Sequence, residues 1–124
     1  MKLIALDESY AIVRLEPDAE LPGWARGGHF WSVTRSDAEL SIVCAENDVP
    51  ADASAERGWR AFEVAGPLDF SLTGIVASLV GPLAEAEISI FVLSTFETDY
   101  LLVREPDLAR AVAALAAAGH TVDG

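Results

Sequence analysis

Hydroxyl and carboxylate side chains are concentrated in residues 94–99, Ser-Thr-Phe-Glu-Thr-Asp, between two apolar runs. The runs, residues 88–93 and 100–103, are rich in β-branched and aromatic residues, which is typical of buried strands. A connection between two strands needs only a glycine, an asparagine or a few charges to remain solvated. A serine, two threonines and an aspartate together can instead orient a small zwitterion, because a carboxylate binds an ammonium group and hydroxyls bind other polar groups.

The composition sets the size and excludes several functions. With 124 residues, of which 52% are hydrophobic, the chain is long enough for one domain or two small fused units with a packed core. Its formal net charge of −12 opposes binding to nucleic acid or to anionic membranes, which both require basic patches. Cys44 is the single cysteine, so an internal disulfide and a thiolate metal cluster are excluded and a reducing cytoplasm is expected.

Neither a secretory signal nor a membrane span is expected. The apolar start of the chain is interrupted at once by Asp7 and Glu8, unlike a signal peptide. The longest uncharged run, residues 70–84, has 15 residues and contains Gly74, Gly81 and Pro82, so it is too short and too broken to span a bilayer.

The N-terminal half has the pattern of a β-rich unit. Short apolar runs predict four strands, of which the first two are alternatively one strand and an extension: residues 2–6, 10–15, 30–35 and 40–45. The last two strands form a predicted hairpin. Prolines and glycines predict that residues 16–28 are mostly loop, with at most one helical turn. The acidic residues 46–58 are the best candidate for a linker.

The C-terminal half begins with an imperfect strand pattern over residues 59–64. From Ser71 the apolar residues recur at spacings of three and four, which predicts a helix capped by Asp69 or Ser71. Pro82 cannot donate to the Ser78 carbonyl, so we expect a kink, a break or a restart of the helix there.

The strands 88–93 and 100–103 follow that helix, and a second helix is predicted to begin at Pro106 and to stop at Gly119. Thr121 and Val122 can add a short final strand. The order strand, helix, strand, strand, helix, strand is the α+β, ferredoxin-like arrangement, in which two helices cover one face of an antiparallel sheet.

This order, together with GPLDFSLTGIVASLVGPLAEAEISIFVLSTFETDYLLV, resembles the ACT domain. The resemblance is narrower to small bacterial ACT proteins whose ACT pairs resemble those of aspartate kinases and animal arginine sensors. It is strongest over residues 59–122, and FWSVTRSDAELSIVC within residues 30–46 resembles the hairpin of the first unit. The resemblance implies a truncated, β-rich ACT-like unit with its linker over residues 1–58 and an ACT domain over residues 59–124.

The resemblance further implies that an amino acid or related metabolite binds near the loop that enters the first helix. The matching positions fall in two clusters: Leu72, Thr73, Gly74 and Ile75 at the helix start, and Thr95, Phe96, Thr98 and Asp99 in the polar connection. A helix N-terminus suits a carboxylate because its N–H groups are unpaired and its dipole end is positive. Asp99 would then hold the ammonium group, Thr95 and Thr98 would add hydroxyls, and Phe96 would shield the apolar part of the ligand.

Each of these residues also has an ordinary structural interpretation. Asp99 can be a solvated residue or a partner of Arg104 or Arg60, and the threonines can satisfy backbone groups of the turn. Phe96 can belong to the core. Gly74 inside a helix costs about 1 kcal/mol against alanine, which close helix–sheet packing explains as well as close approach of a ligand does.

The leading hypothesis is therefore a non-catalytic regulatory or sensor module that binds an amino acid. His29 and His120 are isolated from each other and Cys44 lies among acidic neighbours, so neither a metal, a cofactor nor a nucleophile is expected. The resemblance also implies a homodimer, or alternatively a pseudo-dimer that the chain closes internally. It further implies either action on a partner enzyme in trans or buffering or sensing without an enzyme. The alternative hypothesis is a ligand-free module for oligomerisation or protein interaction.

Overall fold

The computed structural model of the chain describes residues 1–65 and 74–124. The chain divides into two compact units, here called unit 1 (Met1–Asp7 and Arg60–Gly124) and unit 2 (Glu8–Trp59). This grouping differs from the expected division into residues 1–58 and 59–124 at the N-terminus, because Met1–Asp7 joins the C-terminal unit. The strands β1 (Lys2–Leu15) and β4 (Ala55–Val64) each contribute residues to both units.

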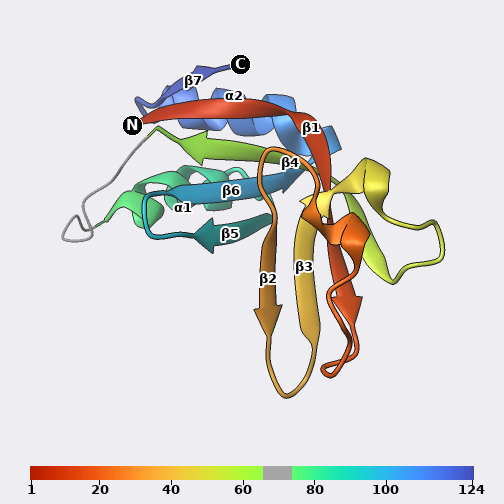
Figure 1. Cartoon of the computed structure of the whole chain (residues 1–124). Helices are drawn as coiled ribbons and strands as arrows, with labels where there is room; N and C mark the ends of the chain where they lie inside the picture. The colour runs from red at the N-terminus through yellow and green to blue at the C-terminus, as the bar shows by residue number, and fades with distance from the viewer. Residues whose placement is uncertain (66–73) are drawn as a thin grey trace. The chain divides into compact units, whose positions relative to one another are not determined.

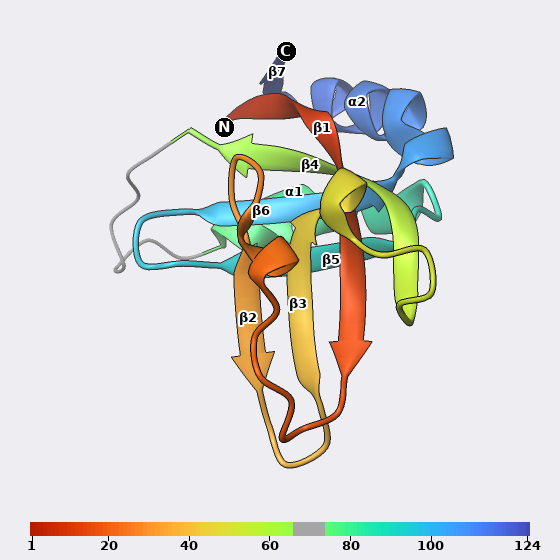
Figure 2. The same cartoon turned by 45° about the vertical axis from the view of Figure 1, so that its right-hand side comes forward.

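Unit 1 has the predicted α+β, ferredoxin-like order. After β4 come α1 (Ile75–Glu85), β5 (Ile90–Ser94), β6 (Asp99–Arg104), α2 (Leu108–Ala117) and β7 (Thr121–Asp123). The strands lie side by side in the order β7-β1-β4-β6-β5 (Figures 1 and 2). β5 and β6 pair antiparallel, whereas β1 pairs parallel to β7. The N-terminal strand therefore lies between the first and last strands of the βαββαβ unit, which the sequence did not reveal.

The core of unit 1 lies between the sheet and its two helices. Alternate residues of a strand point to one face, and the buried strand residues at this core follow that spacing: Leu3, Phe62, Val64, Leu101 and Val103. The helices contribute Leu79, Leu83, Ala111 and Leu115. Burying a large aliphatic or aromatic side chain contributes about 1.5–3 kcal/mol, so this shared core holds the helices against one face of the sheet.

Unit 2 is a β-rich unit with the strand order β2-β3-β1-β4. The predicted hairpin is present as β2 (Ser32–Arg35) and β3 (Leu40–Ala45), which pair antiparallel with Arg35 opposite Leu40. The loop after β1 contains one short 3-10 helix, η1 (Gly23–Arg26), as the glycines and prolines predicted. A separate core fills this unit: Ala11, Val13, Ala25, Leu40, Ile42, Cys44 and Val49.

Several predicted boundaries move in the structure. β1 is one continuous strand, so the interpretation as two strands was wrong. Residues 46–58 are more structured than a linker, because η2 (Glu46–Asp48) begins the segment and β4 starts at Ala55. The Gly58 N–H also donates to Glu46 Oε1 at 2.5 Å, which ties the two ends of this segment together.

The helices also differ from their predicted limits. α1 begins at Ile75, and the predicted caps Asp69 and Ser71 lie outside the described residues. α1 continues through Pro82 to Glu85, so the expected break is absent. Pro106 lies in η3 (Glu105–Asp107), directly before α2, and Gly119 has the positive φ of +95° that suits a helix stop. None of the helices in the described part of the chain is long and apolar enough to cross a membrane.

Candidate functional site

The polar connection between β5 and β6 is closed by a bond between its first and last residues. Ser94 and Asp99 are opposite each other in the strand register, and Ser94 Oγ donates a hydrogen bond to Asp99 Oδ1 at 2.6 Å. This length is typical of a hydroxyl that donates to a carboxylate. Asp99 is half-buried, and among the described residues its other oxygen accepts no hydrogen bond. The structural alternative of an Asp99–Arg60 pair was wrong, since Arg60 contacts Leu6 O and Glu105.

Both threonines of the connection hold its backbone. The Thr95 N–H donates to Thr98 O at 2.8 Å. The Thr95 hydroxyl donates to the same carbonyl oxygen at 3.1 Å and accepts a hydrogen bond from the Thr98 N–H at 3.2 Å. Thr98 Oγ1 donates to Val64 O, the last residue of β4, at 2.6 Å. The structure therefore gives both hydroxyls the turn-holding role that was the alternative interpretation, and it attaches the connection to the end of β4.

Phe96 lies at the tip of the connection and is 78% exposed. The interpretation of Phe96 as a core residue was therefore wrong. An exposed aromatic side chain in the connection that ends at Asp99 can cover the apolar part of a ligand, or it can contact another protein.

At the start of α1, Gly74 precedes the helix and has φ +75°, in the left-handed region. A Cβ atom built on Gly74 meets nothing within 4 Å among the described residues, so the positive φ is the feature of the described structure that requires a glycine here. The predicted position of Gly74 inside the helix was wrong. Ile75 is half-buried and begins the helix, while Leu72 and Thr73 lie outside the described residues.

The first turn of α1 and the β5–β6 connection lie at the same end of unit 1 (Figures 1 and 2). β4 and β5 end there, and β6 and α1 begin there, which places Gly74 and Ile75 on the side of the unit that carries Asp99. The N–H groups of the first helical turn have no carbonyl partner within the helix, since the first intrahelical bond joins Ser78 N to Gly74 O. The structure thus brings Gly74 and Ile75 to the same end of the sheet as the cluster of Thr95, Phe96, Thr98 and Asp99.

Tyr100 and Glu63 were not among the predicted site residues, although they lie next to this end. Burial raises the pKa of Tyr100 above its ordinary value of 10.0, and the charge and hydrogen bond of the Glu63 carboxylate and the charge of Glu97 raise the pKa further. Glu63 follows the alternation of the 59–64 strand, but sequence alone does not tell that this strand lies beside β6. The surroundings of Tyr100 are therefore electronegative.

The described residues give little support for a metal site or for a cysteine nucleophile. No group of three or more histidine, cysteine or acidic side chains among them can hold a metal ion. Cys44 is fully buried, and its pKa is raised to about 11 by burial and by the charge of Asp48. A thiol with a raised pKa is a poor nucleophile at neutral pH.

Two family models match the N-terminal and the C-terminal portions of the chain. A family model described as "ACT domain" matches residues 54–117, more than half of the chain. A second family model, described as an N-terminal domain, matches residues 8–52. The human cytosolic arginine sensor for mTORC1 subunit 1 is 39% identical over 94 residues, which cover 69% of this chain and 29% of the relative. The bovine protein of the same name is 32% identical over 98 residues, covering 70% and 30%. The chain thus spans about a third of the length of these relatives.

Solved structures agree with this assignment. A crystal structure of a protein from Agrobacterium tumefaciens is 48% identical, covers 98% of this chain and 90% of its own, and superposes with a TM-score of 0.92. The regulatory subunit of aspartate kinase from Thermus thermophilus has 11% identity, coverage of 92% and 94%, and a TM-score of 0.63, so it shares the fold. On the match over residues 54–117 and the observed βαββαβ unit, this chain belongs to the ACT domain family.

Proposed function

We propose that this chain binds a free amino acid at the end of unit 1 where the β5–β6 connection meets the first turn of α1. The observation that carries the proposal is the Asp99 carboxylate, which Ser94 holds through one oxygen. Within the described residues its second oxygen accepts no hydrogen bond, so it can bind an ammonium group, which a carboxylate holds through charge-assisted hydrogen bonds.

The first turn of α1 complements Asp99. Its N–H groups and the positive end of the helix dipole suit the α-carboxylate of an amino acid. Gly74 presents its backbone without a side chain directly before this turn. Leu72 and Thr73, which precede Gly74 in the sequence, are also proposed as ligand-binding residues. In this arrangement the two threonines contribute by fixing the position of Asp99, through the bonds to the turn and to Val64.

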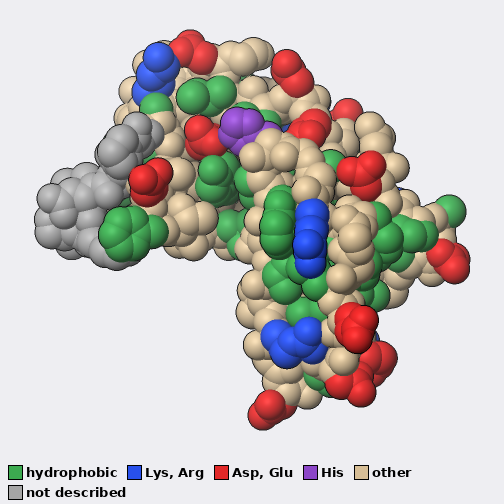
Figure 3. Space-filling view, viewed as in Figure 1, with side chains coloured by type: hydrophobic (Ala, Val, Ile, Leu, Met, Phe, Trp, Pro, Cys, Tyr) green, Lys and Arg blue, Asp and Glu red, His purple; other side chains and the backbone are tan. Residues whose placement is uncertain are grey.

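The surface favours a basic ligand over an acidic one. Acidic side chains are spread over the face seen in Figure 3, with few basic ones between them, and the formal net charge is −12. Glu63 and Glu97 add negative potential beside Tyr100. Such a field attracts cations and repels anions during encounter. The human relative is named as an arginine sensor, so L-arginine is the first ligand to test.

The chain then acts as a non-catalytic regulatory module in the cytoplasm. Ligand binding can change a partner only if the ligand binds one of two states of the module more tightly than the other. The module is proposed to form a homodimer, and the change of state is proposed to act on a partner enzyme in trans. These roles rest on the family assignment and on the exposed position of the connection at the end of the unit.

A thermal-shift screen against the twenty amino acids tests the binding proposal. A ligand present at a hundred times its dissociation constant adds about 2.7 kcal/mol to the folded state. For a domain of this size this raises the Tm by several degrees. L-arginine or L-lysine should produce the largest shift, and L-glutamate and L-aspartate little. The absence of a shift with every amino acid would remove the ligand-binding proposal.

The second candidate function is a ligand-free module for oligomerisation or protein interaction. Two observations favour it: β5 ends the strand order of unit 1, and Phe96 is 78% exposed. An edge strand and an exposed aromatic residue are both features that pair with other chains. Light scattering after size exclusion distinguishes the candidates, because this function predicts that Phe96→Ala changes the oligomeric state without any amino acid present.

A further inference from the structure

Unit 2 contains a pocket that is independent of the site on unit 1. It has a volume of about 220 Å³ and is lined by residues of β1, β3 and β4 and of the segments before β3 and β4: Ile12, Val13, Arg14, Glu39, Ser41, Ser54, Ala55 and Glu56. The Arg14 N–H donates to Ser54 O at 3.0 Å, directly before the start of β4. The pocket therefore lies where β4 begins beside β1.

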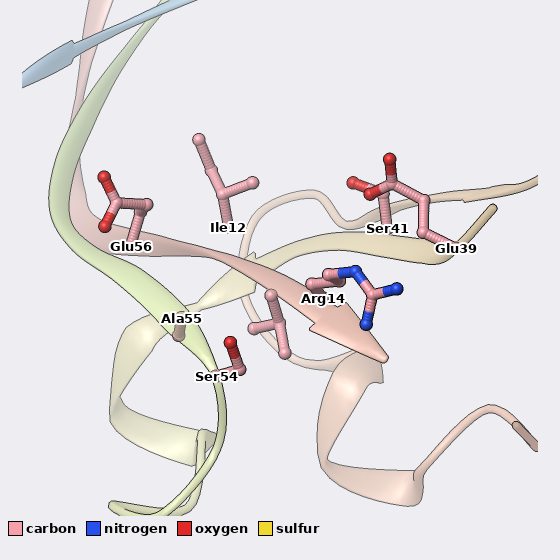
Figure 4. Close-up of a pocket in the computed structure, with 8 residues that line it drawn as sticks. Ile12, Arg14, Glu39, Ser41, Ser54, Ala55 and Glu56 are labelled. Atoms are coloured by element: carbon pink, nitrogen blue, oxygen red, sulfur yellow. The ribbon is translucent and has the colours of Figure 1, made fainter. Parts of the chain in front are cut away.

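The lining combines an apolar part with groups of both charges. Figure 4 shows Ile12 between Glu56 on one side and Glu39 with Ser41 on the other, with the Arg14 guanidinium near Ser41. Arg14 and Ser41 are opposite residues of β1 and β3, which places both side chains on the same face of the sheet. The pocket thus has a cation, hydroxyls and carboxylates around the apolar side chain of Ile12.

Two hydrogen bonds hold the Arg14 guanidinium group and leave other donors of the group for a ligand. Its Nη1 donates to Glu16 Oε1 at 3.2 Å and its Nη2 donates to Ala38 O at 3.1 Å. A guanidinium group has five N–H donors in a planar fork, so the remaining ones can bind a carboxylate. The contact with Ala38 fixes the guanidinium beside the turn of the β2–β3 hairpin, which reduces the entropy lost when a ligand binds.

Two further polar side chains of the lining are available to a ligand. In the described part of the chain, the Ser41 hydroxyl forms no hydrogen bond and the half-buried Glu39 carboxylate has no partner. Ser41 can therefore bind a ligand without releasing an internal contact. Glu39 can accept an ammonium group in the same way.

The charges and the volume limit the class of ligand. Arg14, which also contacts Glu16, is one cation against the two lining carboxylates of Glu39 and Glu56, so a ligand with a single carboxylate and at least one ammonium group is favoured and a dianion is opposed. A cavity of about 150 Å³ accommodates benzene, so about 220 Å³ accommodates a molecule of amino-acid size.

We infer that this pocket is a second ligand site, which binds a small zwitterion with its carboxylate at Arg14 and Ser41 and its ammonium group at Glu39. The site lies wholly within unit 2 and does not depend on Asp99. The two units of the chain would then each carry a small-molecule site of related chemistry.

The test is an amide NMR titration of the Asp99→Ala variant of the full chain, in which the site of unit 1 is disabled. The probes are L-alanine, L-lysine and L-glutamate, added separately. L-alanine and L-lysine should shift the amide signals of Arg14, Ser41 and Ala55 in a saturable way, and L-glutamate should bind more weakly than both. Adding Ser41→Val should weaken binding about tenfold or more, because it removes a hydrogen bond to a charged group and fills space.

Ser32→Val is the matched control, since Ser32 is a strand serine in β2 outside the pocket, and it should leave the affinity unchanged. Glu39→Gln provides a second variant at the rim of the pocket, and it should weaken both probes. The inference is overturned if neither L-alanine nor L-lysine gives saturable shifts at these amides. Equal affinity in Ser41→Val, or binding of L-glutamate as tight as that of L-lysine, also overturns it.

Discussion

His120 Nε2 lies 3.0 Å from the carbonyl oxygen of Ser78, the helix carbonyl that Pro82 leaves without a donor because proline has no N–H. The Nδ1 atom of the same ring lies 3.1 Å from the Met1 ammonium group. The ring therefore donates from Nε2 and accepts at Nδ1. A side chain from the segment after α2 thus provides the hydrogen-bond donor for the Ser78 carbonyl, at the point in α1 where the sequence predicted a kink or a break.

This relationship predicts a coupling between His120 and Pro82. His120→Ala should lower the free energy of unfolding by about 1 kcal/mol, because the Ser78 carbonyl loses its partner. In a Pro82→Ala background the loss should be smaller, since an alanine N–H at position 82 can donate to Ser78. Urea denaturation of the two single variants and the double variant measures the coupling. An equal loss in both backgrounds would contradict the assignment.

Gly74 and Gly81 form a matched pair at the start and in the middle of α1. Within residues 1–65 and 74–124, a Cβ atom added at either position would meet nothing within 4 Å, but only Gly74 of this pair has a positive φ, +75°. Gly74→Ala should therefore lower the free energy of unfolding by about 1–2 kcal/mol, whereas Gly81→Ala should raise it by about 0.5–1 kcal/mol. Thermal unfolding checks both, and the same sign for the two substitutions would refute the conformational explanation.

The bond from Thr98 to Val64 fastens the polar connection to β4. Thr98→Val keeps the shape of the side chain but removes the donor, so it should cost about 1 kcal/mol of stability. Thr98→Ser retains the hydroxyl and should cost less. Denaturant titration gives the stabilities, and hydrogen exchange of the Thr98 amide reports on the turn. If Thr98→Val is as stable as the unaltered chain, the bond does not hold the connection.

The raised pKa of Tyr100 predicts a dependence of stability on alkaline pH. Above its ordinary pKa of 10.0, the unfolded state loses a proton that the folded state still retains. The folded state then binds more protons, so stability falls as the pH rises through this range. Glu63→Gln should lower the pKa of Tyr100 toward 10.0 but not fully, because burial is the larger cause. Ring-carbon NMR separates Tyr100 from Tyr10, and an unchanged pKa in Glu63→Gln would exclude the carboxylate as a cause.

The sequence predicted the local features of unit 1 well, because local patterns encode them. The β-branched runs became β5 and β6, and the polar residues between them became an exposed connection. The spacing of Leu79 and Leu83 placed one face of α1 in the core. The resemblance of the motifs to the ACT domain was confirmed by the family match over residues 54–117.

The features that the sequence missed depend on residues far apart in the chain. The Thr98–Val64 bond spans 34 residues and the His120–Ser78 contact spans 42, so no local pattern signals either. The pairing of Lys2 with Thr121 joins the two ends of the chain, and it moves the first strand into unit 1. The hydroxyls of the connection were recognised, but their use within the turn becomes visible only in the folded geometry.

Asp99 is the residue proposed to bind the ammonium group of an amino acid. Calorimetric titration with L-arginine, or with the amino acid that gives the largest thermal shift, tests it in the unaltered chain, Asp99→Asn and Glu97→Gln. Asp99→Asn keeps an acceptor for Ser94 but removes the charge, so affinity should fall by about tenfold or more. Glu97→Gln removes an exposed charge and should change affinity less. Equal affinity in the unaltered chain and Asp99→Asn would contradict the account.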